Sequence, residues 1–294
     1  MSSFFTYVFN GVSLGSVYAI IALGYTMVYG IAKMLNFAHG DVIMIGGYVL
    51  FTSIYGGGIN PFISLLIAMV MCTILGVVIE KVAYKPLREA TSLAVLITAI
   101  GVSILLQNVA QLIFSSNQKM FKKPIDLGII NLFGGAVSIE GSTIVMIVTG
   151  IVIVVALSLF IKKSKTGRAM LAVSEDKDAA RLMGVNVNTT ITITFAIGSA
   201  LAAIASLLMF NAYPGLVPTS GSMPGIKAFI AAVFGGIGSI PGALVGGILL
   251  GVIEILSKYY ISSQLSDAIV FGMLIIVLLL KPTGIFGKKI QEKV

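Results

Sequence analysis

The sequence predicts an all-α protein, a polytopic transmembrane helical bundle with about eight or nine membrane segments. Of its 294 residues, 57% are hydrophobic and only 10% are charged, whereas roughly 25% of a soluble domain is charged. The mean hydropathy is +1.07. Uncharged runs cover residues 1–32, 42–79, 90–118, 141–161, 182–226, 228–253 and 268–280. A helix crosses a bilayer with about 20 apolar residues, and the alternation typical of a membrane barrel is missing from these runs.

The expected membrane segments are 8–31, 40–56, 62–83, 91–114, 142–162, 190–211, 225–238, 241–257 and 264–281. Residues 1–294 then form one transmembrane domain embedded in the lipid bilayer. The first run has no basic leader and no small-residue cleavage site, so we expect it to be mature structure. Cys72 is the single cysteine, and we expect it to pack as a small hydrophobe.

Basic residues at the segment ends set the expected orientation. The net charge of +8 is explained by these positions and does not indicate nucleic-acid binding. The residues expected on the cytoplasmic side are Lys81, Lys85, Arg88, Lys162, Lys163, Lys165, Arg168, Lys177, Arg181, Lys281, Lys288, Lys289 and Lys293. Lys119, Lys122 and Lys123 fall on the opposite side, against the positive-inside rule.

Two glycine-rich or polar segments are expected to interrupt the helices, near 35–41 and 235–242. The second reads GGIGSIPG, and the orientation requires two crossings or a re-entrant pair around it. Broken helices at membrane depth survive where they are buried or line a cavity, although a plain hairpin turn is the alternative. The candidates for a translocation path are Asn36, His39, Gly40, Asp41, Gly235, Gly236, Gly238, Ser239 and Pro241.

Asn36 and His39 have two further interpretations. They could cap helix ends where the chain breaks, or they could line a path for a polar solute. His39 is the only histidine, and no set of Cys, Asp or Glu accompanies it at ligand spacing, so we expect no metal site.

Glycines at four-residue spacing predict close helix contacts. Gly11 and Gly15 form one such face, and the literal nucleophile-elbow match around Ser13 lies within an apolar helix, where that motif has no meaning. The pairs Gly242/Gly246 and Gly247/Gly251 give the eighth segment two faces of this kind.

Four charged positions lie at or inside membrane segments. Glu80 and Glu254 are interpreted as solvated or snorkelling boundary charges, with Lys258 one turn after Glu254 in the favourable order. Lys227 interrupts an apolar stretch. We expect it to snorkel outward, with a polar cavity and an anionic partner as the alternative.

The polar loop at about 163–188 is the largest polar segment with helical periodicity. It predicts one or two short helices that end at a glycine stop, and an ordinary basic topology loop is the alternative. The small-residue face expected to meet a partner protein consists of Ala169, Ala172, Ala179, Ala180 and Gly184. The candidate coupling residues are Arg168, Glu175, Asp176, Asp178, Ala179, Ala180 and Gly184.

Enzymatic activity is not expected. The sequence has no Gly-x-x-x-x-Gly-Lys-Ser/Thr phosphate loop, and it offers neither a nucleophile–base pair nor a convincing mid-membrane carboxylate. Energy for transport must therefore come from elsewhere, or the flow is passive.

The blocks NGVSLGSVYAIIALGYTMVYGIAKMLNFAHGD, KAFIAAVFGGIGSIPGALVGGILLGVIE and KPTGIFG resemble the permease subunits of bacterial branched-chain amino acid ABC transporters. The chain is most similar to the shorter of the two paired permeases, and residues 118–141 are the least similar part. In such importers a loop of the pattern Glu-Ala-Ala-x-x-x-Gly docks into the ATPase. Residues 178–184 match it with Asp178 in place of Glu.

The resemblance implies an inner-membrane importer with a second homologous permease, two cytoplasmic ATPases and a periplasmic or lipid-anchored substrate-binding protein. ATP would be hydrolysed by those partners, and this chain would bind no cofactor itself. Amide and urea permeases share the same blocks, so a urea or short-amide permease and a passive facilitator for a small neutral solute stay open as alternatives.

Overall fold

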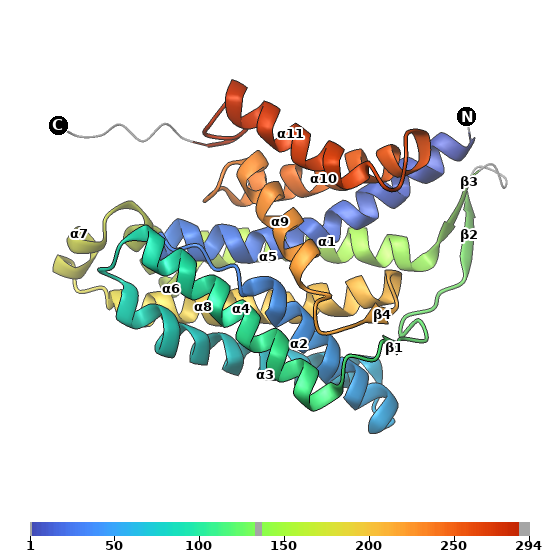
Figure 1. Ribbon diagram of the computed structural model, residues 1–294. Helices are drawn as coiled ribbons and strands as arrows, with labels where there is room; N and C mark the ends of the chain where they lie inside the picture. The colour runs from blue at the N-terminus through green and yellow to red at the C-terminus, as the bar shows by residue number, and fades with distance from the viewer. Residues whose placement is uncertain (1, 133–136, 288–294) are drawn as a thin grey trace.

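The computed structural model describes residues 2–132 and 137–287, and in these residues the chain is a helical bundle (Figure 1). Its α-helices are α1 (Ser2–Ala32), α2 (His39–Phe51), α3 (Pro61–Ile79), α4 (Ser92–Phe114), α5 (Gly141–Lys163), α6 (Lys165–Glu175), α7 (Lys177–Leu182), α8 (Val187–Ala212), α9 (Ser222–Gly235), α10 (Ile240–Tyr260) and α11 (Ser266–Leu280). A π-turn η1 (Thr52–Gly56) extends α2, and η2 (Glu80–Tyr84) and η3 (Lys85–Leu87) extend α3.

Six of the described helices are long and apolar enough to cross a membrane, namely α1, α3, α4, α5, α8 and α10. The helices α9 and α11 are shorter and apolar, and α2 with η1 spans 39–56. Within the described residues, each of the nine expected segments overlaps one of these helices, with boundaries a few residues apart.

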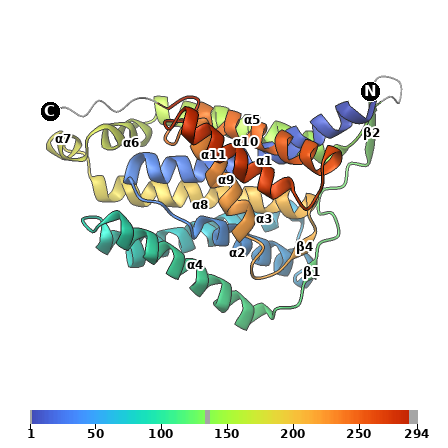
Figure 2. The same cartoon turned by 45° about the horizontal axis from the view of Figure 1, so that its top comes forward.

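Four short strands were not expected from the sequence. β1 (Lys119–Met120) pairs antiparallel with β4 (Gly215–Leu216), and β2 (Ile129–Leu132) pairs antiparallel with β3 (Val137–Glu140). They lie at the end of the bundle opposite α6 and α7 (Figures 1 and 2). They fall largely in the segment that resembled the family least.

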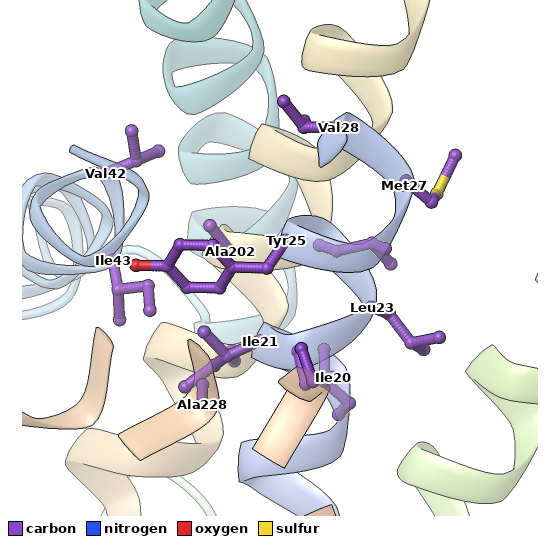
Figure 3. Packing of buried hydrophobic residues seen from close by; sticks show 14 of the residues in the cluster. Ile20, Ile21, Leu23, Tyr25, Met27, Val28, Val42, Ile43, Ala202 and Ala228 are labelled. Carbon is purple, nitrogen blue, oxygen red and sulfur yellow. The ribbon is translucent and has the colours of Figure 1, made fainter. Parts of the chain in front are cut away.

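α1 is the central helix of the bundle. It packs against α5, α8, α9 and α10, and 94% of its apolar window is buried within the chain, against 17% for α4. Ile20, Ile21 and Leu23 occupy the core around it, with side chains from α2, α8 and α9 (Figure 3). The outer helices α3, α4, α5 and α11 carry exposed apolar side chains, as expected of helices that face lipid.

Glycines allow α1 and α10 to touch through their backbones, as the four-residue spacing predicted. A Cβ atom on Gly15 would lie 2.6 Å from Ile248 Cα, and one on Gly247 would lie 2.6 Å from Ala19 Cα. Gly242 and Gly246 form the other face of α10 and pack on Gly235 and Ala231 of α9. Lipid provides no hydrophobic force between helices, so close van der Waals packing of this kind holds the bundle together.

Basic residues gather at the end of the bundle that carries α6 and α7. Arg88 bonds to Asn188 at the start of α8, so the α3–α4 connection lies at this end. Lys123 lies at the opposite end, where its ammonium pairs with Glu140 at 3.0 Å. This hydrogen bond raises the pKa of Lys123. Lys288, Lys289 and Lys293 lie outside the described residues.

Candidate functional site

Helices α6 and α7 form the polar region that the sequence marked as a partner site. α6 packs against the ends of α1, α5 and α8, and α7 follows it directly. Asp176 caps α7, because its carboxylate accepts hydrogen bonds from Asp178 N and Ala179 N, both at 2.9 Å. These contacts fix where α7 begins.

Gly184 ends α7 in a left-handed conformation. Its φ is +83°, and no atom lies within 4 Å of the position that a Cβ would take. Gly184 N donates to Arg181 O and Val185 N donates to Ala180 O, both at 3.0 Å. This pair of bonds is a Schellman motif, in which glycine has no steric cost. The predicted glycine stop is therefore present.

The candidate coupling residues do not all face outward. Six of them are exposed or half-exposed, but Ala180 is only 4% exposed and packs inward. Ala180 was therefore wrongly placed on the small-residue face. Leu182 and Met183 are 89% and 84% exposed, and neither was among the predicted residues. Two large apolar side chains beside a glycine at the tip of a polar loop are a signal that could have identified them.

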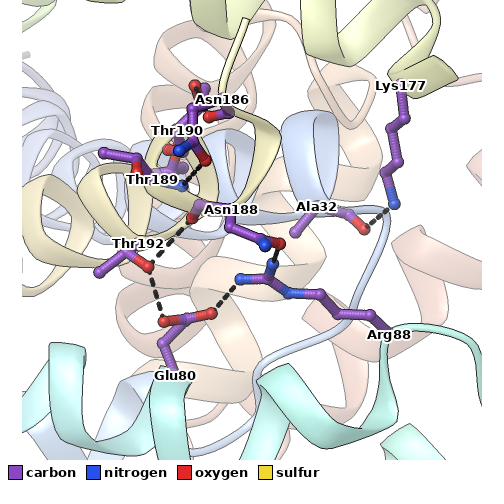
Figure 4. Close-up of polar contacts among 10 residues, drawn as sticks. Ala32, Glu80, Arg88, Lys177, Asn186, Asn188, Thr189, Thr190 and Thr192 are labelled. Atoms are coloured by element: carbon purple, nitrogen blue, oxygen red, sulfur yellow. Dashed lines mark hydrogen bonds and ion pairs between the residues drawn. The ribbon is translucent and has the colours of Figure 1, made fainter. Parts of the chain in front are cut away.

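Lys177 forms a hydrogen bond between this region and the end of the central helix α1. Its Nζ donates to the backbone oxygen of Ala32, the last residue of α1, at 2.9 Å (Figure 4). A lysine at a helix carboxyl end also interacts favourably with the helix dipole. Burial lowers the pKa of Lys177, and the positive charges of Arg88 and Lys33 lower it further. α7 therefore contacts the central helix directly.

A second polar cluster joins the end of α3 to the start of α8. Glu80 accepts hydrogen bonds from Arg88 and, at 2.8 Å, from Thr192 Oγ1, and Arg88 also bonds to Asn188 (Figure 4). The Glu80 side chain is fully buried. The interpretation of Glu80 as a solvated boundary charge is therefore wrong.

The first break runs from residue 33 to residue 38, between α1 and α2. Asn36 Oδ1 accepts a hydrogen bond from Tyr84 Oη at 2.9 Å. His39 begins α2, is 2% exposed, and its ring lies against Gly24 of α1. Neither side chain caps α2, whose N-cap has no side-chain hydrogen bond, so the capping interpretation fails at the start of α2.

Gly40 and Asp41 lie in the first turn of α2 and meet the start of α9. A Cβ on Gly225 would lie 2.9 Å from Gly40 Cα. Asp41 is 1% exposed and accepts a hydrogen bond from Gln107 Nε2 at 2.9 Å, and the same nitrogen lies 3.1 Å from Ser222 Oγ. These contacts join α2, α4 and α9 within the bundle.

The second break separates α9 from α10 at residues 236–239. Gly236 has a φ of +101°, and Ser239 caps α10 by accepting from Gly242 N at 3.1 Å. Pro241 stands in the first turn of α10, where its missing N–H costs nothing. Gly235 packs on Gly242, and a Cβ on Gly30 would lie 3.3 Å from Gly238 Cα.

The two breaks come together at one crevice. It is too narrow to hold a water molecule, and its lining residues are Tyr25, Tyr29, Leu35, Asn36, Phe229, Ala232 and Ile237. Leu35 and Asn36 come from the first break and Ile237 from the second. In this conformation the predicted path is therefore closed where the two breaks meet.

Lys227 lies inside the bundle, in an ion network between α9, α10 and α11. Its ammonium pairs with Glu254 at 2.8 Å and with Asp267 at 2.7 Å, and its side chain is 8% exposed. Glu254 also binds Lys258 at 2.6 Å and Tyr18 Oη at 2.8 Å. The expectation that Lys227 snorkels is wrong, and so is that of a solvated Glu254. The alternative expectation, that Lys227 meets an anionic group in a polar environment, is the correct one.

The described residues contain no group of three or more His, Cys, Asp or Glu side chains that could hold a metal ion. Cys72 is buried, with its Sγ 3.6 Å from Val42 O, and packs as a small hydrophobe.

A multi-pass helical bundle with two breaks between its helices is an architecture typical of membrane transport permeases. The family model for the permease component of branched-chain amino acid transport systems matches residues 7–278. The high-affinity branched-chain amino acid transport permease LivH of Escherichia coli (strain K12) is 43% identical, over 99% of this chain and 98% of that protein.

Two further relatives agree. The high-affinity branched-chain amino acid transport permease BraD of Pseudomonas aeruginosa is 44% identical over 97% of this chain and 96% of that protein. The probable branched-chain amino acid transport permease LivH of Methanocaldococcus jannaschii is 32% identical over 91% of this chain and 88% of that protein. The chain belongs to the branched-chain amino acid transport permease family and is a multi-pass inner membrane protein.

Proposed function

We propose that this chain is the membrane-spanning permease subunit of an ABC importer that carries branched-chain amino acids into the cell. One observation carries the proposal: the chain aligns along nearly its whole length with permeases named for this transport, at 43–44% identity. No feature of the described residues favours urea, short amides or a passive flow over this substrate class.

The partners follow from the same class of transporter. We propose a second homologous permease, two cytoplasmic ATPases that hydrolyse ATP, and a periplasmic or lipid-anchored substrate-binding protein. The exposed tip of α7, formed by Leu182, Met183 and Gly184, supports docking of an ATPase there. An apolar tip that projects from a polar arm fits into a groove of a partner protein.

Alternating access would then use the contact between Lys177 and Ala32. Closure of the ATPases on ATP moves α6 and α7, and the hydrogen bond from Lys177 transmits this movement to the end of α1. Helix α1 ends at Ala32, and the first break follows it directly. Such a movement would therefore reach the closed crevice through the first break. Rigid-body movement around broken helices is a common route to alternating access.

Purification from native membrane tests the assembly, with partners identified by mass for wild type and for Gly184→Arg. A matched control is Gly58→Arg, because Gly58 also has a positive φ (+65°) and open space around it, and it lies in the loop before α3, away from α7. We expect an ATPase and a second permease with wild type and Gly58→Arg, and loss of the ATPase with Gly184→Arg.

Reconstitution tests the substrate. The complex in liposomes should take up leucine only with ATP and the binding protein. Uptake of urea by the chain alone without ATP would identify a facilitator and overturn the proposal. Cysteines at Asn36 and Ser239 test the path, since their labelling should change with substrate or nucleotide. Unchanged labelling at both would remove the crevice from the path.

A further inference from the structure

A cavity of about 300 Å³ lies at the end of the bundle opposite α6 and α7, away from the closed crevice. Helices α1, α5, α8 and α10 supply its walls, the start of α9 reaches it, and strand β3 forms part of its rim. Sites for small molecules occupy about 300–1,000 Å³, so this cavity is the size of a site for a small solute. Neither the expected path residues nor the coupling residues line it.

One face of α1 forms a continuous wall of the cavity. Asn10, Ser13, Leu14, Val17 and Tyr18 line it at the three- and four-residue spacing of a helix. This face carries apolar groups in its middle and hydroxyl or amide groups on either side. The wall therefore suits an amphipathic solute.

The opposite walls extend the apolar surface. Met146 of α5, Met209 of α8 and Ile255 of α10 face the cavity together with Leu14 and Val17. Ser13 Oγ donates a hydrogen bond to Met146 Sδ at 3.0 Å, so the Ser13 hydroxyl beside this apolar surface already has a partner. Methionine side chains adapt to apolar ligands of varied shape. This surface matches a branched aliphatic side chain.

The rim carries groups for both ends of a zwitterion. Glu140 lines the cavity, and its side chain is 55% exposed, with Lys123 at 3.0 Å and Ser142 Oγ at 3.2 Å. Each oxygen of this exposed carboxylate has further lone pairs, so Glu140 can accept a hydrogen bond from an ammonium group besides those from Lys123 and Ser142. The hydroxyl and amide groups of Thr143, Tyr213 and Asn10 can donate to a carboxylate. Urea or a short amide could also donate to Glu140, but it has no side chain to cover the large apolar wall.

The cavity also touches the buried ion network. Tyr18 lines the cavity, and its hydroxyl donates to Glu254, which pairs with Lys227 on α9. α9 begins beside Gly40 and ends at the second break. A solute in the cavity therefore touches Tyr18, and the contacts that continue from Tyr18 through Glu254 and Lys227 to α9 lead to both breaks.

We propose that this cavity is a binding site for a free amino acid with a branched aliphatic side chain, occupied before the solute reaches the closed crevice. The side chain packs on Val17, Met146 and Met209, and the ammonium group faces Glu140. The identity of the ligand rests on the function proposed above, whereas the location of the site rests on the cavity itself.

Protection of an introduced cysteine tests the site in the full transporter complex. Cys72 is buried, so Ser138→Cys, at an exposed position that lines the cavity, places an accessible thiol in this chain, and its modification by a membrane-impermeant thiol reagent is followed from the mass of the subunit. Leucine at roughly ten times its dissociation constant should slow the reaction about tenfold by occupancy. Asn117→Cys is the control, because residue 117 is exposed in the loop after α4 and does not line the cavity.

Two results would overturn the proposal. One is unchanged labelling of Ser138→Cys with leucine in a complex that still imports leucine with ATP. The other is equal protection by urea and leucine. Tyr213→Cys, which is also exposed and lines the cavity, repeats the measurement should Ser138→Cys impair folding. A complex that fails to import leucine at all contradicts the proposed function instead, so the two failures are distinguishable.

Discussion

The Nζ atom of Lys177 lies 2.9 Å from the backbone oxygen of Ala32, so α7 is joined by one hydrogen bond to the last residue of the central helix. α7 is a helix of six residues that projects from the bundle, whereas α1 is the most deeply buried of the six long spans. This hydrogen bond connects the proposed ATPase site directly to the central helix, and it gives the first prediction.

Lys177→Ala should weaken coupling between ATP hydrolysis and transport. Residues along a coupling path change the coupling by about 0.5–2 kcal/mol, so leucine uptake per ATP should fall roughly 2- to 30-fold. The measurement is uptake and ATPase rate in liposomes. Lys165→Ala, an exposed lysine in the first turn of α6, is the control and should behave as wild type. Unchanged uptake per ATP in Lys177→Ala would remove this contact from the mechanism.

The ionisation of Lys177 also predicts a pH dependence of stability. Its pKa in the folded chain lies below the ordinary 10.5, first because of burial and then because of Arg88 and Lys33. The unfolded chain therefore binds the proton more tightly, and stability contributed by this group rises with pH between the lowered pKa and 10.5. Relative to Lys177→Met, wild type should gain thermal stability as the pH approaches 10.5. A constant difference in Tm from neutral pH upward would contradict the buried position.

Lys227→Met should destabilise the chain. Removal of one partner from a buried ion pair costs about 3–5 kcal/mol when the other charge is left unpaired. Glu254 is 1% exposed but keeps Lys258 and Tyr18 as partners, so the expected cost is about 3 kcal/mol or less. The matched control is Asp267→Asn, since the Asp267 side chain is 43% exposed and an exposed pair contributes about 0–1 kcal/mol. Thermal unfolding in detergent should separate the two variants, and similar Tm values for both would argue against the network.

Gly247→Ala should prevent tight packing of α1 on α10. The new Cβ would lie 2.6 Å from Ala19 Cα, a backbone atom that cannot rotate away, and overpacking costs about 1–3 kcal/mol or more. Gly101→Ala is the control, because Gly101 lies in α4 with nothing within 4 Å, and alanine gains up to about 1 kcal/mol in a helix. The yield of monodisperse protein reports the difference, and equal yields would show that the helices separate at little cost.

Leu182→Asp combined with Met183→Asp should release the ATPase while leaving the bundle folded. Both side chains are more than four-fifths exposed, so their loss removes contacts to a partner and almost none within the chain. Leu265→Asp is the control, because Leu265 is exposed at the N-cap of α11, where aspartate is favourable. Retention of the ATPase by the double variant would place the docking surface elsewhere on the chain.

Features that depend on local pattern were predictable from the sequence. The two breaks, the glycine faces of α1 and α10, and the glycine stop at Gly184 follow from residue types at fixed spacing, and the structure contains all of them. The central position of α1 is only weakly indicated by the sequence. Its hydropathy is the lowest of the six long spans, which is expected because a helix surrounded by protein needs fewer apolar residues than one surrounded by lipid.

Features that depend on pairing between distant segments were not predictable. Lys227 and Glu254 are 27 residues apart, on either side of a break whose geometry decides whether they meet. Until that geometry is known, a lone lysine beside an apolar run is as compatible with snorkelling as with a buried ion pair. The cavity likewise needs side chains from α1, α5, α8 and α10 together. The roles of Asn36, Ser239 and the other path candidates stay predictions.

The near-complete enclosure of α1 has a consequence for biogenesis. Tyr18 reaches its partner Glu254 only after 236 further residues have been synthesised, which takes roughly 10–50 s at about 5–20 residues per second. During this interval the glycine face and the hydroxyl groups of the first helix have none of their partners in α10. The nascent helix must therefore wait in the bilayer or beside the insertion machinery, and an aberrant helix–helix pairing formed in that interval would block the later insertion of α10.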